Sequence, residues 1–124
     1  MKGPKPRLVV DNDAVKAVPR APAWLSSEAA AEWRRIMPGL VLRRILTTAD
    51  LGSVENYCVA QGRVRQVEKL IAMANPDALP ALTRMQDKAM TTARQLAAEL
   101  GLTPVSRSRP VMRDEDDDDS LLDS

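Results

Sequence analysis

Apolar and small residues recur at every third or fourth position between residues 47 and 74, and this stripe constrains the fold more than any other feature of the sequence. Such spacing is the period of one face of a helix. The stripe consists of Leu51, Val54, Tyr57, Ala60, Val64, Val67, Ile71 and Ala74. Thr47 and Asp50 have the spacing of a capping box, so the helix is predicted to begin near Thr48. At about 40 Å it would be too long for the rest of so short a chain to cover.

A second stripe with the same period follows, at Leu82, Met85, Ala89, Ala93, Leu96 and Leu100. Pro80 is tolerated at the first position of a helix, and Gly101 supplies the left-handed residue that ends many helices. Between the stripes, Asn75-Pro76-Asp77 cannot continue a helix comfortably, so the chain is predicted to turn back. We therefore expect an all-α fold built on a long antiparallel helical hairpin of residues 48–74 and 81–100.

A shorter helix is predicted before the hairpin. Ser26 can cap its first free N–H groups, and Glu28 in the first turn complements the helix dipole. Trp24 and Trp33 hold most of the aromatic area, so both are expected to anchor this helix onto the hairpin. Pro38-Gly39 is expected to end or kink the helix. Its apolar face comprises Ala29, Trp33, Ile36 and Met37, with Glu32, Arg34 and Arg35 placed elsewhere.

The regions outside the stripes differ in composition. Residues 1–23 repeat prolines and basic residues and contain few large apolar ones, so they are predicted to form a flexible basic arm. Residues 24–104 are expected to be the helical core and oligomerisation domain. Residues 105–124 are predicted to form a disordered tail that is first basic and then acidic. The disorder is expected because the unbroken acidic run from Asp114 to Asp119 repels itself.

The predicted core is too small to make a single subunit stable on its own. Chains of this size usually need disulfides, a metal or self-association. Cys58 is the only cysteine, which excludes a disulfide within the chain, and the sequence has no histidine, which disfavours a metal site. We therefore expect self-association through surplus apolar residues of the hairpin, namely Val59, Leu70, Met73 and Met90.

The sequence lacks the residue patterns that catalysis usually requires. It has no histidine for acid–base chemistry, no glycine-rich phosphate loop and no serine in a nucleophile elbow. Cys58 has no histidine to activate it and falls within the predicted helical body. We therefore expect no enzyme, no catalytic residue, no metal and no cofactor. The absence of an apolar run of about 20 residues and of a signal peptide predicts a soluble, intracellular protein with no membrane partner.

Charge is distributed unevenly although its sum is only +1. Residues 1–113 carry 18 basic and 10 acidic residues, whereas residues 114–124 carry seven acidic residues and no basic one. This asymmetry suggests a polyanionic partner for the body of the chain and a separate role for the tail.

Short segments spread along the chain resemble, in their order and spacing, the small subunit of a tailed-phage terminase. They are Gly3-Pro4-Lys5-Pro6, Pro22-Ala23-Trp24-Leu25-Ser26, Glu28-Ala29, Glu32-Trp33-Arg34-Arg35-Ile36, Leu46-Thr47, Asp50, Tyr57-Cys58, Gly101-Leu102-Thr103-Pro104 and Ser106-Arg107. The resemblance implies a non-catalytic DNA-packaging protein of the host cytoplasm that recognises double-stranded viral DNA. It also implies a ring of identical subunits that delivers DNA to the large subunit, which carries the ATPase and nuclease. The chain departs from many such subunits because the proline-rich segment before Trp24 cannot form a separate helix-turn-helix domain.

The candidate contacts to the DNA backbone are basic residues: Lys2, Lys5, Arg7, Arg34, Arg35, Arg43 and Arg44. The acidic tail is a candidate docking peptide for the large subunit through Asp116, Asp117, Leu121 and Leu122, with a DNA mimic and a solubilising tail as alternatives. The competing function is a small helical scaffold or regulatory adaptor without nucleic acid binding. A sequence-specific repressor is a weaker option, because no predicted helix presents the Asn, Gln and Arg pattern that reads base edges.

Overall fold

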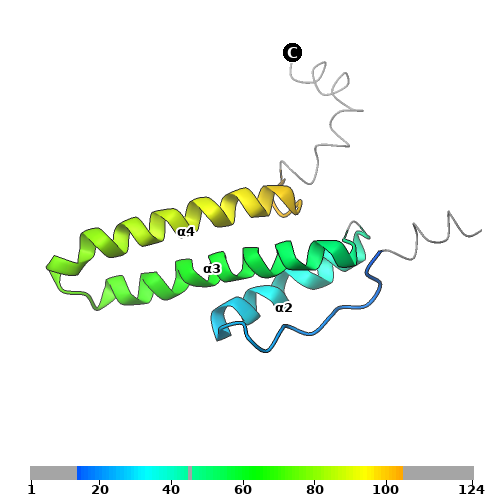
Figure 1. Cartoon of the computed structure of the whole chain (residues 1–124), viewed down its shortest axis with the longest axis horizontal. Helices are drawn as coiled ribbons and strands as arrows, with labels where there is room; N and C mark the ends of the chain where they lie inside the picture. Colours follow the sequence, from blue (N-terminus) through cyan, green and yellow to red (C-terminus); the bar gives the residue numbers. More distant parts are fainter. Residues whose placement is uncertain (1–13, 45, 105–124) are drawn as a thin grey trace, which may run out of the picture.

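The computed structural model describes residues 14–44 and 46–104. Within these ranges the chain forms three α-helices, α2 (Ser27–Leu42), α3 (Leu51–Ala72) and α4 (Leu79–Glu99), with one-turn 3-10 helices at Thr48–Asp50 and Pro76–Ala78. Figure 1 shows α4 turning back along α3 to make the hairpin, with α2 beside the other side of α3. The central helix α3 packs against both others, whereas α2 and α4 do not pack on each other. The predicted all-α fold with an antiparallel helical hairpin is confirmed.

Both ends of the hairpin follow the local signals in the sequence. At the start of α3, Asp50 Oδ2 accepts hydrogen bonds from the Thr47 backbone N–H at 2.8 Å and from the Thr47 hydroxyl at 3.0 Å. After α4, Gly101 adopts a left-handed φ of 73°. The N–H of Leu102 then donates to the carbonyl of Ala97 at 2.8 Å, which is the bond that defines a Schellman cap. The predicted capping box and the predicted role of Gly101 are both confirmed.

Helix α2 begins as predicted but runs further. Ser26 Oγ accepts from the Ala29 N–H at 3.1 Å, which confirms the predicted cap. The helix does not end at Pro38-Gly39, because it continues to Leu42 with Pro38 inside it. Proline removes one backbone hydrogen bond, but Leu40 beyond it is fully buried, so the apolar contacts of this last turn outweigh the loss.

The segment before α2 lies against the helices from residue 14 onward. The N–H of Val15 donates to the carbonyl of Leu46 at 2.9 Å, and the Val15 side chain is buried. Trp33 Nε1 donates to the Pro19 carbonyl, also at 2.9 Å. The predicted flexible arm through residue 23 therefore differs from the structure at residues 14–23. The physical reason is that a buried indole N–H needs an acceptor, and the extended chain supplies one. The rest of the arm, residues 1–13, and the tail, residues 105–124, lie outside the described residues.

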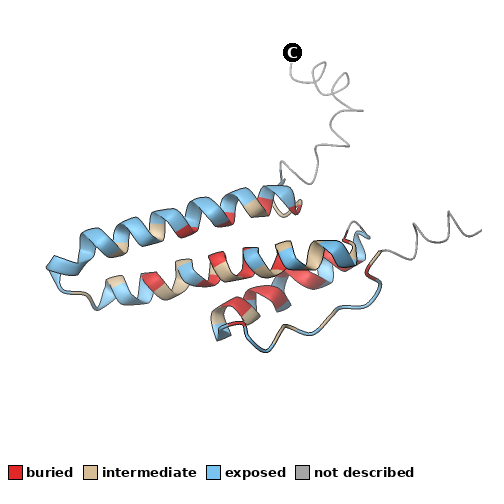
Figure 2. Cartoon of the chain, in the orientation of Figure 1, coloured by how far each residue is buried: buried red, intermediate tan, exposed pale blue. Residues whose placement is uncertain are grey.

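The core is concentrated where α2 meets α3. In Figure 2 the buried positions gather at this junction, whereas α4 is exposed over most of its length. The largest fully buried side chains are Trp33, Met37, Leu40, Glu32, Val54 and Cys58. Helix α4 contributes a narrow strip of small residues, Ala89, Ala93 and Ala97. The hairpin is therefore held by few large apolar side chains, and its half near the turn extends beyond α2.

The two tryptophans have opposite environments. Trp33 is buried, as predicted for an anchor, but Trp24 is 63% exposed, so the prediction that it anchors the helix is wrong. Trp24 precedes the first turn of α2. Of the predicted surplus apolar residues of the hairpin, Leu70, Met73 and Met90 are exposed, Met73 at 79%, whereas Val59 packs partly against the core.

Candidate functional surfaces

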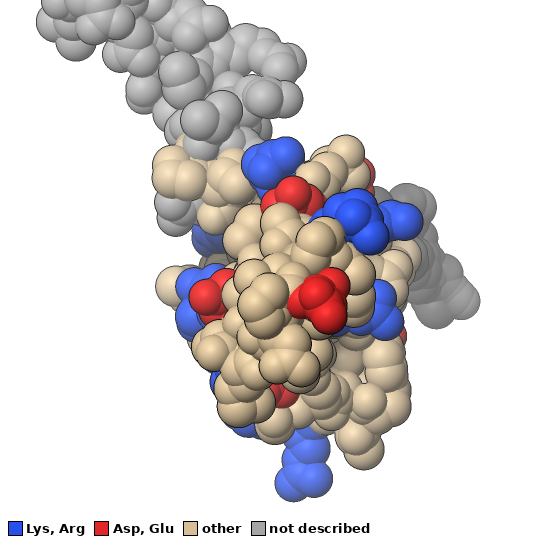
Figure 3. All heavy atoms as spheres, turned by 90° about the vertical axis from the view of Figure 1, so that its left-hand side faces the viewer, with Lys and Arg blue, Asp and Glu red and all other residues tan. Residues whose placement is uncertain are grey.

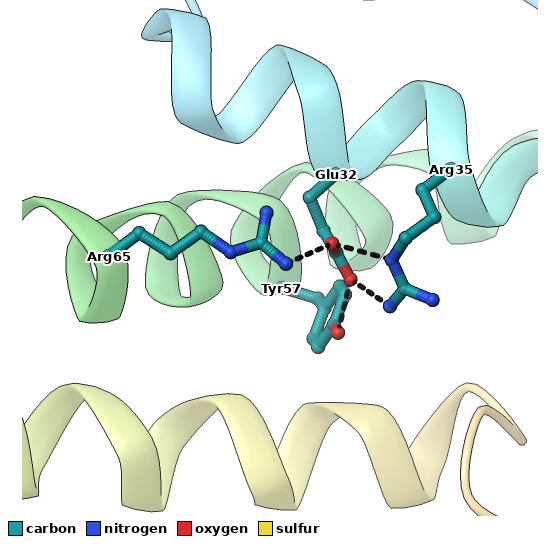
Figure 4. A network of polar contacts seen from close by, with 4 residues as sticks. All are labelled: Glu32, Arg35, Tyr57 and Arg65. Carbon is teal, nitrogen blue, oxygen red and sulfur yellow. Dashed lines mark hydrogen bonds and ion pairs between the residues drawn. The ribbon is translucent and has the colours of Figure 1, made fainter.

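A buried carboxylate joins α2 to α3. Glu32 is inaccessible to solvent, and its two carboxylate oxygens accept hydrogen bonds from three side chains (Figure 4). Arg35, one turn further along α2, donates from Nε at 2.9 Å and from Nη2 at 2.5 Å. From α3, the Tyr57 hydroxyl donates at 2.6 Å and Arg65 Nη2 at 3.3 Å. Each oxygen thus has two donors, which leaves the carboxylate no free position for a substrate proton.

The partners of Glu32 keep it ionised in spite of its burial. Burial alone raises the pKa of a carboxyl, but the hydrogen bonds from Arg35 and Tyr57 and the charges of Arg35 and Arg65 outweigh that effect, so the pKa of Glu32 is lowered. Burial and the hydrogen bond to Glu32 raise the pKa of Tyr57, which keeps its hydroxyl a donor. These effects describe a structural ion-pair network between two helices.

Placing Glu32 on the polar side of its helix is the main error of the sequence-based prediction. A signal was present, because Glu32 lies three residues after Ala29 and four before Ile36, which puts it within the apolar stripe. A carboxylate in that position needs buried donors. Only the placement of Tyr57 and Arg65 on the facing helix shows where the donors come from.

Further contacts fix α2 along α3. Glu28 Oε2 accepts from Lys69 Nζ at 3.0 Å, and this hydrogen bond is the main reason that the pKa of Glu28 is lowered to about 2. Between this pair and the Glu32 network, the backbones approach closely at Gly62, where a Cβ atom would lie 2.9 Å from the Ala29 nitrogen. The α2–α3 contact is therefore close and specific.

Of the seven predicted DNA-binding residues, four lie in the described part of the chain, and they fall into two groups. The side chains of Arg34 and Arg44 are exposed and form no hydrogen bond or ion pair within residues 14–44 and 46–104. Arg35 is held by Glu32 although its side chain is 63% exposed. Lys2, Lys5 and Arg7, together with the predicted docking residues Asp116, Asp117, Leu121 and Leu122, lie outside the described residues.

Arg43 connects the ends of two helices. Its Nη1 donates to the Gly101 carbonyl at 3.0 Å, and its Nε donates to the Gly39 carbonyl at 3.4 Å. The final carbonyls of a helix carry partial negative charge and lack partners in the helix, so a guanidinium is well suited to both ends. Arg43 thus ties the end of α2 to the end of α4, a role that sequence reasoning did not predict.

Other basic residues are spread over the surface. Arg63, Arg84, Lys88 and Arg94 are exposed, and the sequence-based choice of DNA contacts left them out. Seen from the turn of the hairpin, basic side chains lie on several sides of the molecule and do not merge into one continuous patch (Figure 3). This view of the folded part therefore offers no single basic face.

An open groove of about 870 Å³ runs between α3 and α4 beside Trp24. Most of its lining is apolar. The charged residues that line it are Arg63 and Lys88, and no acidic residue does so. The full lining is Trp24, Asn56, Val59, Ala60, Arg63, Gln66, Val67, Leu70, Met85, Lys88, Ala89, Thr92 and Leu96. This groove is both apolar and positively charged.

Other kinds of site receive no support in the described part of the chain. No group of three or more potential metal ligands occurs among residues 14–44 and 46–104. Within the same residues, no helix has the length and hydropathy that a membrane span requires. Cys58 is fully buried, and burial is the main cause that raises the pKa of its thiol to about 12, so it behaves as a small apolar side chain.

The fold and these surfaces define a small helical protein whose accessible features are contact surfaces. The family described as phage terminase, small subunit, matches residues 29–117, which include nearly all of α2 and the whole hairpin. The chain belongs to this family, which confirms the resemblance found in the sequence and associates the protein with the packaging of phage DNA. The small subunit of a terminase is generally the non-catalytic one. Neither the curated proteins nor the solved structures contain a match.

Proposed function

We propose that this chain binds double-stranded phage DNA in the host cytoplasm and presents it to the large terminase subunit, which performs the catalysis. The observation that carries the proposal is membership of the small-subunit family over residues 29–117. The described part of the chain fits a binding role, because it exposes apolar side chains and several cations that form no ion pair.

Of the four predicted DNA contacts in the described part of the chain, Arg34 and Arg44 are the ones without an internal partner. Both are exposed and neither is held by an acidic side chain. Arg35 and Arg43 have internal partners, so a phosphate would have to compete with Glu32 or with helix-end carbonyls. The proposed contacts of the arm are Lys2, Lys5 and Arg7.

The salt dependence of DNA binding tests this assignment. Each phosphate contact contributes about 0.9 to the slope of log K against log salt concentration, so Arg34→Ala with Arg44→Ala should reduce the slope by about 1.8. The matched control is Arg84→Ala with Arg94→Ala, which removes the same charge from exposed positions on α4. Equal reductions for the two pairs, or none for the first pair, would remove Arg34 and Arg44 from the interface.

We also propose that the chain assembles as a homo-oligomer, as a ring, through the hairpin. The support is the exposure of Leu70 and Met73 near its turn, together with the narrow alanine strip by which α4 packs on α3. Light scattering on the full chain measures this directly. A folded single subunit at high concentration would contradict the oligomer, and Leu70→Ser with Met73→Ser should lower the mass if the oligomer forms through this surface.

The acidic tail is proposed to dock on the large subunit through Asp116, Asp117, Leu121 and Leu122. Deletion of residues 114–124 separates this role from a DNA mimic. Loss of large-subunit binding supports docking, whereas tighter non-specific DNA binding supports the mimic.

A helical scaffold or adaptor without nucleic acid binding remains the second candidate. The observation that favours it is the internal engagement of Arg35 and Arg43, two of the four predicted DNA contacts in the described part of the chain. Gel retardation of duplex DNA at low salt by the protein without residues 114–124 distinguishes the two. Retardation supports the packaging role, and its absence supports the adaptor.

A further inference from the structure

The groove between α3 and α4 is an uncovered apolar surface that carries positive charge. Met85, in its wall, is 53% exposed, and Trp24 at its edge is 63% exposed. Arg63 and Lys88 form no ion pair within the described residues. A surface of this kind suits a peptide that combines apolar side chains with acidic ones.

The C-terminal tail of the chain has that chemistry most strongly. Residues 114–119 are all acidic, and Leu121-Leu122 follow directly. The N-terminal segment, residues 1–13, lacks this strong negative charge, because Lys2, Lys5 and Arg7 outnumber its two acidic residues, Asp11 and Asp13. Complementarity of charge therefore favours the C-terminal segment over the N-terminal one.

The distance that the tail has to cover is short. The tail leucines are placed near Met85, and from Leu100 back to Met85 the rise along α4 is about 22 Å. A random-coil chain with the length of residues 105–120 spans about 22 Å. When the length of a tether matches its span, the effective concentration of the tethered group reaches the millimolar range, so a weak contact is sufficient for docking.

We propose that the C-terminal tail of the same chain docks in this groove. Leu121 and Leu122 lie among the apolar side chains near Met85, and the acidic run faces Arg63 and Lys88. The docked tail covers apolar surface of an unassembled subunit, and it is withheld from other partners until something displaces it. The proposal does not depend on DNA binding, and its test contains neither DNA nor the large subunit.

A spin label on the tail of the full chain tests the contact. Ser120→Cys provides the attachment site, because Cys58 is buried and its thiol, with a pKa of about 12, does not compete for the label. Methyl NMR of the methionines then offers a matched pair on α4, since Met85 lines the groove and Met90, which is 43% exposed, does not. Docking should reduce the Met85 signal at least three-fold relative to a sample with the spin label chemically reduced. The Met90 signal, about 8 Å away along α4, should be reduced less.

Two variants test the chemistry of the contact. Leu121→Ser with Leu122→Ser should restore most of the Met85 signal, and so should Arg63→Ala with Lys88→Ala. The control Arg84→Ala with Arg94→Ala removes the same charge outside the groove and should leave the broadening in place. If the control pair restored the Met85 signal as much as Arg63→Ala with Lys88→Ala, the proposed contact of the acidic run with Arg63 and Lys88 would be overturned.

The remaining outcomes overturn the proposal. An unaffected Met85 means that the tail lies elsewhere. Broadening that passes from spin-labelled chains to isotope-labelled chains in a mixed sample means that a neighbour's tail occupies the groove. A Met85 methyl that is protected from a soluble paramagnetic agent but insensitive to the tail label means that a second copy covers the groove.

Discussion

Two glycines in α3 offer the same substitution in opposite environments. At Gly62 a Cβ atom would lie 2.9 Å from the nitrogen, 3.1 Å from the Cα and 3.2 Å from the Cβ of Ala29. At Gly52 a Cβ atom would have nothing within 4 Å. Changing each to alanine therefore separates the effect of helix propensity from the effect of the α2–α3 contact.

The expected magnitudes have opposite signs. Alanine is favoured over glycine by about 1 kcal/mol in a helix interior, and by less near the first turn, so Gly52→Ala should raise the free energy of unfolding by about 0.5 kcal/mol. At Gly62 the same gain is opposed by overpacking, which costs about 1–3 kcal/mol when backbone must move. The added methyl would separate α2 from α3 and stretch the bonds of Glu32. We expect Gly62→Ala to lower the free energy of unfolding by about 1 kcal/mol or more.

Urea unfolding followed by helical circular dichroism measures both variants. Protein concentration must be equal throughout, because self-association changes apparent stability. In thermal unfolding the difference between the variants should be about 6–12 °C, given about 4–8 °C per kcal/mol for a domain of this size. If Gly62→Ala proves as stable as Gly52→Ala, the close approach of α2 and α3 at Ala29 is refuted.

Three further predictions concern buried or engaged groups. Glu32→Gln should lower the free energy of unfolding at pH 7 by about 2 kcal/mol in urea titrations, because charge-assisted hydrogen bonds are lost. The pKa of Glu32 is lowered from 4.5 in the folded protein, so the ionised carboxylate stabilises the fold fully above pH 4.5 and loses this effect on acidification below it. The difference in stability between wild type and variant should therefore shrink at acidic pH. A difference that stays constant with pH would contradict this role of Glu32. Cys58 should react with a thiol reagent at pH 8 far more slowly in the folded protein than in urea, and equal rates would contradict its burial. Arg43→Ala should cost about 1 kcal/mol of stability by releasing the Gly101 carbonyl, and an unchanged urea midpoint would show that this link contributes little.

Features that depend on neighbours in sequence were predictable. The capping box at Thr47 and Asp50, the turn around Pro76 and the left-handed Gly101 all follow from interactions within a few residues. The two apolar stripes likewise predicted the hairpin, because a helix must bury its apolar face whatever it packs against.

Features that depend on distant residues were not predictable in the same way. The burial of Glu32 needs donors from α3, and the exposure of Trp24 depends on where α2 meets the hairpin. Arg43 was chosen as a DNA contact for its charge, yet its nearest partner, the Gly101 carbonyl, comes from a segment 58 residues away.

Periodicity and capping thus predicted the helices and their order, because these are properties of short segments. The family followed from the resemblance of short motifs and from the match over residues 29–117. The packing of α2 on α3 decided which charged groups are buried, which arginines are left free and where a groove stays open. Those outcomes depend on distances between side chains of different helices, which no pattern along a single chain contains.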